Sequence, residues 1–458
     1  MRSTSDAARP GVRNEPGADG ESPHHPEAPD LALAERWLGP TLKHALKSNF
    51  HRPRLAGLEH AASTASWHLL PEMTREQLES CMGDIVLDAG TRREYVHTGG
   101  SSGRPLVFPK TLAEESFIRE FFSQVETGRD RDLVRGIRFT TPYHGHETPV
   151  PVHAWFHKIS PFDYGGFAFA RRLLSTPWDA PGVACDCTVI AGAERFVRAF
   201  TLDCEAAGLE GASSPVAFLL PNGQYISAAW RRRYTEYWGA VTIDRFALSE
   251  AFGGATEDPE TGWYLFDLCC FPEVVALDTR RPISEGMGEL ILTPLYPFQQ
   301  GLPLIRYATG DLVAVNGRHP RSAGHPAIRP LGRLCHAIPA DDTGMPLVPA
   351  AIGAEVIDEM PDVCRAPLYR DARHLVARRG LGHAIYHMGR ATDDERAVIR
   401  FHVQLEPDSQ VDAARADAVR ERFHVHYRRI VGDHLPDHVS LDVRFGPPPS
   451  QDLISHAP

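Results

Sequence analysis

The segment that most constrains the fold is residues 301–312, which read Gly-Leu-Pro-Leu-Ile-Arg-Tyr-Ala-Thr-Gly-Asp-Leu. Leu304–Tyr307 suits a half-buried β-strand, because leucine and isoleucine pack well on a pleated surface and Pro303 limits where the strand begins. Gly310 permits a sharp turn that leaves Asp311 facing outward at the strand end. A carboxylate there can accept two hydrogen bonds from vicinal hydroxyl groups, as acidic residues do with ribose in dinucleotide-binding folds. An ordinary surface strand closed by an Asx turn is the alternative.

The composition excludes several classes of protein. The chain of 458 residues is long enough for two or three domains. Its formal charge of -11, from 48 basic and 59 acidic residues, gives no electrostatic footprint for nucleic acid or anionic lipid. No apolar run has spanning length and the N-terminus lacks the apolar region of a secretory signal, so we expect no membrane segment. Eight scattered cysteines predict reduced thiols and a cytoplasmic location.

The order of segments predicts an α/β fold. Between about residue 95 and residue 310, short β-rich runs alternate with helical segments, which is typical of a layered α/β domain. Residues 1–30 are rich in Pro, Gly, Ser, Glu and Asp and predict a disordered tail. The Gly-, Pro- and Arg-rich stretch 316–330 resembles a boundary, and 333–458 is long enough for a small α+β domain.

Apolar spacing predicts a helical layer over 31–50, broken at Gly39-Pro40. Thr74 and Gln77 have the spacing of a capping box before a further helix. The other elements that we expect are the strands Arg138–Thr141, Cys187–Ala191, Val216–Leu220, Gly288–Thr293 and Val439–Phe445 and the helices Thr111–Glu126, Glu194–Ala207, Ala228–Trp238 and Asp412–Val431.

A second motif lies in residues 95–110, where three glycines and three hydroxyl residues separate two β-like runs. Such a loop can turn its amides and hydroxyls toward one point and form a nest for phosphate oxygens. It is not a Walker loop, because no Gly-Lys-Ser/Thr follows, and a plain Gly/Ser-rich hairpin is the alternative. The candidate phosphate-binding residues are Gly100, Ser101, Ser102 and Gly103.

A third motif, Phe246-Ala-Leu-Ser-Glu250, ends a strand-like run and is followed by Gly253-Gly254. A glutamate beside the hydroxyl of Ser249 suits Mg²⁺, which prefers hard oxygen ligands and keeps water and phosphate oxygens in its shell. A Ser-Glu pair at the start of a helix is a common alternative.

Together these motifs resemble the adenylate-forming superfamily, in the version carried by phenylacetate–CoA ligases. Pro-Leu-Ile-Arg-Tyr-Ala-Thr-Gly-Asp, Gly-Ser-Ser-Gly-Arg-Pro, Phe-Ala-Leu-Ser-Glu and the earlier Leu-Pro-Glu-Met-Thr-Arg-Glu-Gln-Leu occur in the family's order over about 65–335. The resemblance implies a large N-terminal domain (31–332), a small mobile C-terminal domain (333–458) and a bound nucleotide between them. It implies that Asp311 and Arg333 hold the ribose of ATP, that Phe246 lies near the adenine, and that Glu250 binds Mg²⁺ with Ser249 beside it. Arg306 is a further candidate for a nucleotide contact.

The resemblance also implies a function. It predicts ATP-dependent activation of an aromatic or hydrophobic carboxylic acid as an acyl-AMP, followed by transfer to CoA, a carrier-protein thiol or an amine. Tyr143, His144 and His146 fall where the family places the wall of its acyl pocket. A metal pair is the alternative for this His-x-His, but no third ligand is spaced to complete it.

The chain departs from the family at its far end. Its only lysines are Lys43, Lys47, Lys110 and Lys158, so the family's C-terminal lysine, which bridges the carboxylate and the α-phosphate, is absent. Arginine is a wide fork rather than a point charge and does not simply replace it. Two other readings therefore stay open: an altered ligase that forms an amide or N–N bond in secondary metabolism, and a pseudo-ligase that binds a nucleotide or acyl ligand without turnover.

Overall fold

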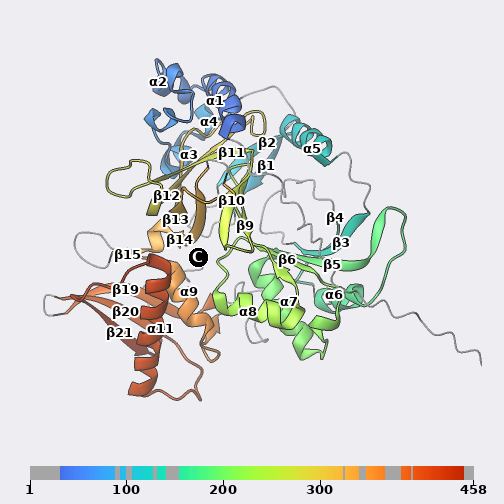
Figure 1. Cartoon of the computed structure of the whole chain (residues 1–458), viewed down its shortest axis with the longest axis vertical. Coiled ribbons are helices and arrows are strands. Elements are labelled where there is room, and N and C mark those ends of the chain that lie inside the picture. The colour runs from blue at the N-terminus through green and yellow to red at the C-terminus, as the bar shows by residue number, and fades with distance from the viewer. Residues whose placement is uncertain are drawn as a thin grey trace, which may run out of the picture.

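The chain folds around one large mixed sheet and one small sheet (Figure 1), which confirms the predicted α/β class. The predicted tail over 1–30 lies outside the described residues. No helix in the described part of the chain combines the length and the apolar character needed to cross a bilayer. The computed structural model describes residues 31–87, 93–98, 106–126, 132–140, 154–163, 165–322, 325–339, 347–366, 383–393 and 396–447.

The large sheet has 12 strands and consists of an antiparallel half and a parallel half. The two halves meet at β8 (Arg245–Ala247), which runs antiparallel to β9 and parallel to β6. The antiparallel half, from the outer edge to β8, consists of β11 (Cys270–Val275), β12 (Glu285–Pro294), β13 (Tyr307–Asn316), β14 (Ala327–Arg333), β10 (Trp263–Phe266) and β9 (Gly254–Asp258). The parallel half, from β8 to the other edge, consists of β6 (Phe218–Asn222), β5 (Val183–Ala193), β3 (Leu133–Phe139) and β4 (Ala154–Ile159), and β7 (Val241–Thr242) pairs with β6.

Apolar side chains on the helices explain how the parallel half is covered. Helices α6 (Gly166–Leu174) and α7 (Glu194–Ala206) contact β5, and α8 (Ala228–Trp238) contacts β7. Their buried aromatic residues form one core with the strands, in which Phe200 packs against Phe139 and Trp238.

The antiparallel half is packed by the N-terminal helices and by the hairpin of β1 (Arg93–His97) and β2 (Val107–Thr111). The hairpin confirms two strands around the predicted phosphate loop. The other helical segments here are α1 (Leu31–Ala45), α2 (His51–Leu55), η1 (Glu59–Ala61), η2 (Trp67–Leu69), α3 (Arg75–Ser80), α4 (Met82–Ile85) and α5 (Leu112–Glu126), and η3 (Gly211–Ser213) lies between α7 and β6.

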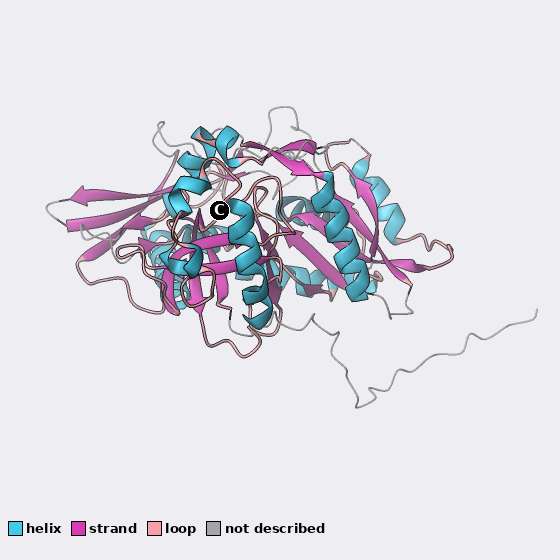
Figure 2. Cartoon of the chain, turned by 90° about the horizontal axis from the view of Figure 1, so that it is seen from above, coloured by secondary structure: helices cyan, strands magenta, loops and turns pink. Residues whose placement is uncertain are grey.

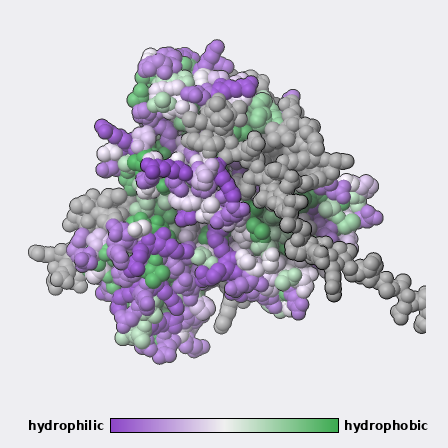
Figure 3. Space-filling model, viewed as in Figure 1, coloured by the Kyte–Doolittle hydropathy of each residue, from purple (hydrophilic) through white to green (hydrophobic). Residues whose placement is uncertain are grey.

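Downstream of β14 the chain forms a small α+β unit with its own apolar core. Its three strands project at one end of the molecule (Figure 2), and hydrophilic residues prevail over its described surface in the view of Figure 3. Its elements are η4 (Leu334–His336), β15 (Ile338–Pro339), β16 (Leu347–Val348), α9 (Ala350–Asp358), β17 (Arg365–Ala366), β18 (His383–Ala384), β19 (Tyr386–Asp393), β20 (Arg396–Val403), α11 (Ala413–Val431) and β21 (Val439–Phe445).

Two carboxylates on α9 attach this small unit to the large one. Asp358 accepts hydrogen bonds from both terminal nitrogens of Arg198, at 2.8 and 3.2 Å, and Arg198 also donates to Glu194. Glu355 accepts the amide of Ala228 at the start of α8 and the hydroxyl of Tyr225 at 2.6 Å. The attachment is therefore made of buried charges, whereas the predicted mobility of the small unit stays a prediction.

Most of the predicted elements are present, and three expectations are wrong. The helix α1 runs through Pro40 instead of breaking there. Leu304–Tyr307 is not a strand: β13 begins at Tyr307, so Asp311 lies inside a strand rather than after one. The predicted boundary 316–330 contains the start of β14, which belongs to the large sheet. In contrast, the capping box of Thr74 and Gln77 is confirmed.

We predict that Arg198→Met strongly destabilises the protein. The substitution leaves the buried Glu194 without its cation and leaves Asp358 with only the longer contact to Arg365, at 3.5 Å, which should lower the free energy of unfolding by about 3–5 kcal/mol. Chemical denaturation measures the change, and the exposed Arg232→Met on α8 is the matched control, expected to stay within about 0.5 kcal/mol of the unsubstituted protein. Equal effects of the two substitutions would contradict a buried attachment.

Candidate functional site

The buried Asp311 and the partly exposed Arg333 form an ion pair across two neighbouring strands. They are direct partners in the register of β13 and β14. Arg333 Nη1 donates to Asp311 Oδ1 at 3.0 Å and to the carbonyl oxygen of Thr309 at 3.0 Å. The second carboxylate oxygen, Oδ2, is buried and has no hydrogen-bond partner in the described part of the chain. The structure thus holds one carboxylate oxygen in place and leaves the other open to a donor from a ligand.

A β-bulge in β13 creates this arrangement. Along β12 the paired residues advance from Glu289 to Ile291, while on β13 they advance from Leu312 to Ala308, so 309–311 is bulged. Gly310 sits in the bulge with φ of 73°, a conformation that side-chain-bearing residues rarely adopt. Bulges re-aim side chains and occur often beside active sites. The bulge, rather than the predicted turn at a strand end, therefore orients Asp311.

Glu250 is the second buried carboxylate of the site. It follows β8, and its Oε1 accepts a hydrogen bond of 2.9 Å from the hydroxyl of Tyr307, the first residue of β13. Among the described residues no hydrogen bond or ion pair engages its Oε2. Because Tyr307 and Asp311 lie on one strand, the two predicted motifs meet in space, and sequence reasoning missed Tyr307 as the link although it stands in the motif.

The position of Phe246 and Glu250 follows from the junction of the two half-sheets. Phe246 lies in β8, and a Cβ on its neighbour Gly254 would come within 2.2 Å of the Phe246 carbonyl oxygen. Only glycine therefore allows β9 to approach β8 so closely. In open α/β sheets ligands bind beyond the carboxyl ends of strands where the strand order switches, which is where Glu250 leaves β8.

Lys110 at the end of β2 is a charged neighbour that sequence reasoning did not single out. Only 7% of it is exposed, and its Nζ lies 5.7 Å from the ring centroid of Phe108. Phe108 belongs to the same apolar cluster as Ala251 and Tyr307, which flank Glu250. Burial lowers the pKa of Lys110, while Glu114 and Glu250 oppose that shift. In the described structure no group forms a hydrogen bond or ion pair with its ammonium. A lysine in an otherwise apolar strand was the available signal.

Arg306 precedes Tyr307 in the chain, but its side chain contacts groups other than Asp311, Arg333 and Glu250. Its guanidinium donates to Glu273 Oε2 at 2.8 Å and to the carbonyl oxygen of Leu70 at 2.6 Å. These contacts explain Arg306 as a residue that stabilises the fold. Its predicted contact with a nucleotide stays a prediction, which this geometry does not support. Ser249 is exposed beside Glu250 and forms no hydrogen bond with the described residues. The predicted Gly100, Ser101, Ser102, Gly103, Tyr143, His144 and His146 lie outside the described residues.

The donor set limits the kind of metal site that is possible. Within the described ranges, no group of three or more His, Cys, Asp or Glu side chains is arranged to hold a metal ion. A single open carboxylate oxygen on Glu250 fits Mg²⁺, since this ion usually takes one or two carboxylates and completes its shell with water and phosphate oxygens.

Comparison with solved structures defines the class of fold. No protein-family model matches the chain, and no curated protein matches it. Solved structures of an acyl-CoA ligase are similar along most of the chain, so the chain has the fold of the adenylate-forming ligases. One of them is 2-hydroxyisobutyryl-CoA ligase in an open conformation with 2-HIB-AMP and CoA: it is 13% identical, with a TM-score of 0.63, over 92% of this chain and 89% of that chain. The same ligase in its postadenylation state with 2-HIB-AMP is 14% identical, with a TM-score of 0.63, over 93% of this chain and 88% of that chain.

We predict that Asp311→Asn does not destabilise the protein at neutral or alkaline pH. Burial raises the pKa of Asp311, against the opposing effect of Arg333. A carboxyl with a raised folded-state pKa binds protons more readily in the folded state, so its contribution to stability falls as the pH rises above the ordinary value. The denaturation midpoint of the variant should therefore equal or exceed that of the unsubstituted protein at pH 8, and the advantage should vanish toward pH 4.

The exposed Asp278→Asn serves as the control, because a surface substitution should change the stability by no more than about 0.5 kcal/mol. A loss of stability in Asp311→Asn at every pH would show that the Arg333 contact outweighs burial.

Proposed function

We propose that the protein activates a carboxylic acid with ATP, forming an acyl-AMP, and transfers the acyl group to CoA. The observation that carries the proposal is the buried, unpartnered Oδ2 of Asp311 beside Arg333, on the same strand as the Tyr307 hydroxyl that holds Glu250. An acidic group with one free oxygen is suited to the vicinal hydroxyls of a ribose. The fold shared with adenylate-forming ligases supports this assignment.

In the proposed reaction, a carboxylate oxygen of the acid attacks the α-phosphorus of ATP and pyrophosphate leaves. A thiol sulfur then attacks the acyl carbon, AMP leaves, and the thiol proton passes to solvent. Asp311 and Arg333 fix the nucleotide by its ribose, while Glu250 would hold Mg²⁺, which supplies positive charge to the phosphates. No protein nucleophile is required, because orientation and charge stabilisation lower the barrier.

The finer assignments rest on the sequence resemblance. The subtype is that of phenylacetate–CoA ligases, the acid is aromatic or hydrophobic, Phe246 lies near the adenine, and the residues Gly100–Gly103 contact the phosphates. CoA is the first acceptor to test, because the similar 2-hydroxyisobutyryl-CoA ligase binds it. A carrier-protein thiol or an amine is tested in the same assay.

We predict acid-dependent release of pyrophosphate in the presence of ATP and Mg²⁺, and of AMP when CoA is added. Asp311→Ala should raise the KM for ATP by about tenfold or more, because hydrogen bonds to a charged group are lost. Glu250→Ala should lower kcat by a factor of about 100 or more, because charge stabilisation in the transition state is lost. A panel of aromatic and aliphatic acids, with coupled detection of pyrophosphate, measures both effects.

Glu236→Ala, an exposed substitution on α8, is the control and should behave like the unsubstituted protein. ATP binding without pyrophosphate release for any acid, with or without an amine co-substrate, would contradict acid activation and favour a binding protein without turnover. Release that requires an amine would instead identify an amide- or N–N-bond-forming ligase.

A further inference from the structure

Two arginines adopt a backbone conformation that is unfavourable for any residue with a side chain. Among the described residues, Arg280 (φ of 55°) and Arg306 (φ of 48°) alone combine a positive φ with a side chain. Such residues persist only where the surrounding structure holds them, and they occur often at functional sites. Both arginines therefore need an explanation from their contacts.

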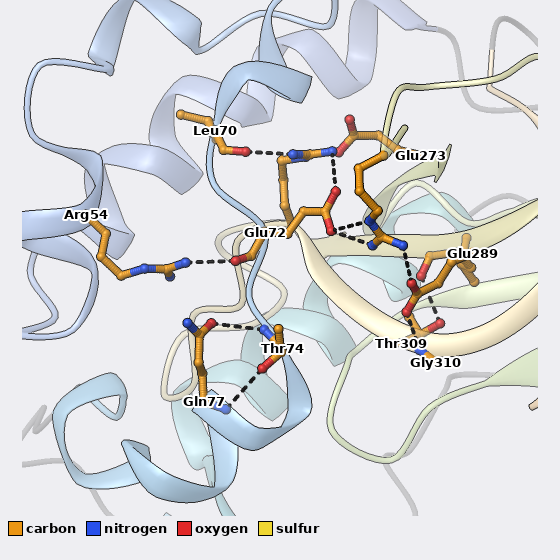
Figure 4. A network of polar contacts seen from close by, with 12 residues as sticks. Arg54, Leu70, Glu72, Thr74, Gln77, Glu273, Glu289, Thr309 and Gly310 are labelled. Atoms are coloured by element: carbon orange, nitrogen blue, oxygen red, sulfur yellow. Dashed lines mark hydrogen bonds and ion pairs between the residues drawn. The ribbon is translucent and has the colours of Figure 1, made fainter. Parts of the chain in front are cut away.

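Both side chains reach the carboxylate of Glu72, the residue labelled near the centre of Figure 4. Arg280 donates to Glu72 Oε2 through Nη2 at 2.5 Å and through Nε at 3.2 Å. Arg306 Nη2 lies 3.5 Å from Glu72 Oε1. Glu72 lies just before α3, more than 200 residues before both arginines in the sequence. Its carboxylate therefore contacts both residues that have a positive φ.

The other end of Arg280 leads to the bulge that carries Asp311. Arg280 Nη1 donates to Glu289 Oε2 at 2.6 Å, and Glu289 Oε1 accepts the amide of Gly310 at 3.1 Å (Figure 4). A bulged amide has lost its partner in the ladder, and an unpaired buried amide is unfavourable. The Glu289 carboxylate replaces that partner, and Arg280 fixes the direction of the carboxylate.

The segment is held at its other end as well. The backbone of Met73 accepts the amide of Ala308 and donates to the carbonyl oxygen of Arg306. Residues 72 and 73 therefore hold 306–308 directly and hold Gly310 through Arg280 and Glu289. This leaves little freedom for the backbone that ends at Asp311.

We propose that Arg280 and Glu289 are positioning residues of the nucleotide site, which set the backbone at Gly310 and so aim the free oxygen of Asp311 at the ribose hydroxyls. The inference rests on the proposed function through the role of Asp311. Arg280 and Glu289 touch no substrate in this scheme and act only through the bulge.

The test compares binding of ATP with binding of 2′,3′-dideoxy-ATP by calorimetry. The unsubstituted protein should prefer ATP, because only ATP offers ribose hydroxyls to Asp311. Arg280→Ala and Glu289→Ala should reduce this preference by about fivefold or more, since a displaced carboxylate forms poorer hydrogen bonds. A general loss of folded protein would lower binding of both nucleotides and leave their ratio unchanged.

Two further variants sharpen the result. Glu289→Gln keeps an acceptor for the Gly310 amide and should restore most of the preference that Glu289→Ala loses. Arg281→Ala removes the same charge from the adjacent exposed position, whose side chain forms no hydrogen bond or ion pair with the described residues, and should keep the full preference. Hydrogen exchange of the peptide containing Gly310 should become faster in Arg280→Ala and not in Arg281→Ala.

The outcomes separate the two proposals. A full preference for ATP in folded Arg280→Ala and Glu289→Ala would overturn the positioning role while the proposed function stands. Failure of the unsubstituted protein to bind ATP, or to prefer it over the dideoxy nucleotide, would overturn the ribose role of Asp311 and the positioning role with it.

Discussion

The pairing of Asp311 with Arg333 depends on the β-bulge at residues 309–311 of β13. A regular β13 would place residues 309–311 in the ladder with β12, and the alternation of side chains along the strand would then set the direction of the Asp311 carboxylate. In the bulge, residues 309–311 lie opposite the single residue Leu290 of β12. Side chains satisfy the backbone there: Glu289 accepts the Gly310 amide, and Thr309 donates to the Leu290 carbonyl oxygen. Because the backbone groups stay satisfied, the strand tolerates a conformation that serves the carboxylate.

The junction in the sheet explains why the two acidic motifs meet. Parallel strands need long crossover connections, whereas antiparallel strands follow one another through short turns. β8 lies where the two halves of the sheet join, and β14, β10 and β9 lie between it and β13. The contact between Glu250 and Tyr307 is therefore made by the segment that follows β8 and not by two adjacent strands. Glu250 leaves the first half and contacts Tyr307 of the second half. Residues separated by 57 positions thus meet through the topology of one sheet.

The sequence predicted the fold class and many elements because their signals are local. Apolar spacing located α8 and α11, and Thr74 with Gln77 formed the expected capping box. The bulge at Gly310 was not predictable, because Thr-Gly-Asp is also the pattern of a turn and only the partner strands decide between them. Likewise, nothing local in the sequence indicates that Glu72, Arg280 and Glu289 meet. Their contacts depend on tertiary register, which a single sequence does not reveal.

Several unfavourable features gather around Asp311 and Glu250. Asp311 is a buried carboxyl with an unpartnered oxygen, Lys110 is a buried ammonium without a direct ion pair in the described structure, and two arginines hold left-handed backbone. Each of these features lowers the stability of the folded state. None is needed to form the sheet, because a neutral residue at position 311 or a glycine at position 280 could adopt the same backbone conformation. Large apolar cores on both halves of the sheet offset this cost. Unfavourable groups beside Asp311 and Glu250 are what the proposed function requires, because a site kept for chemistry gives up stability.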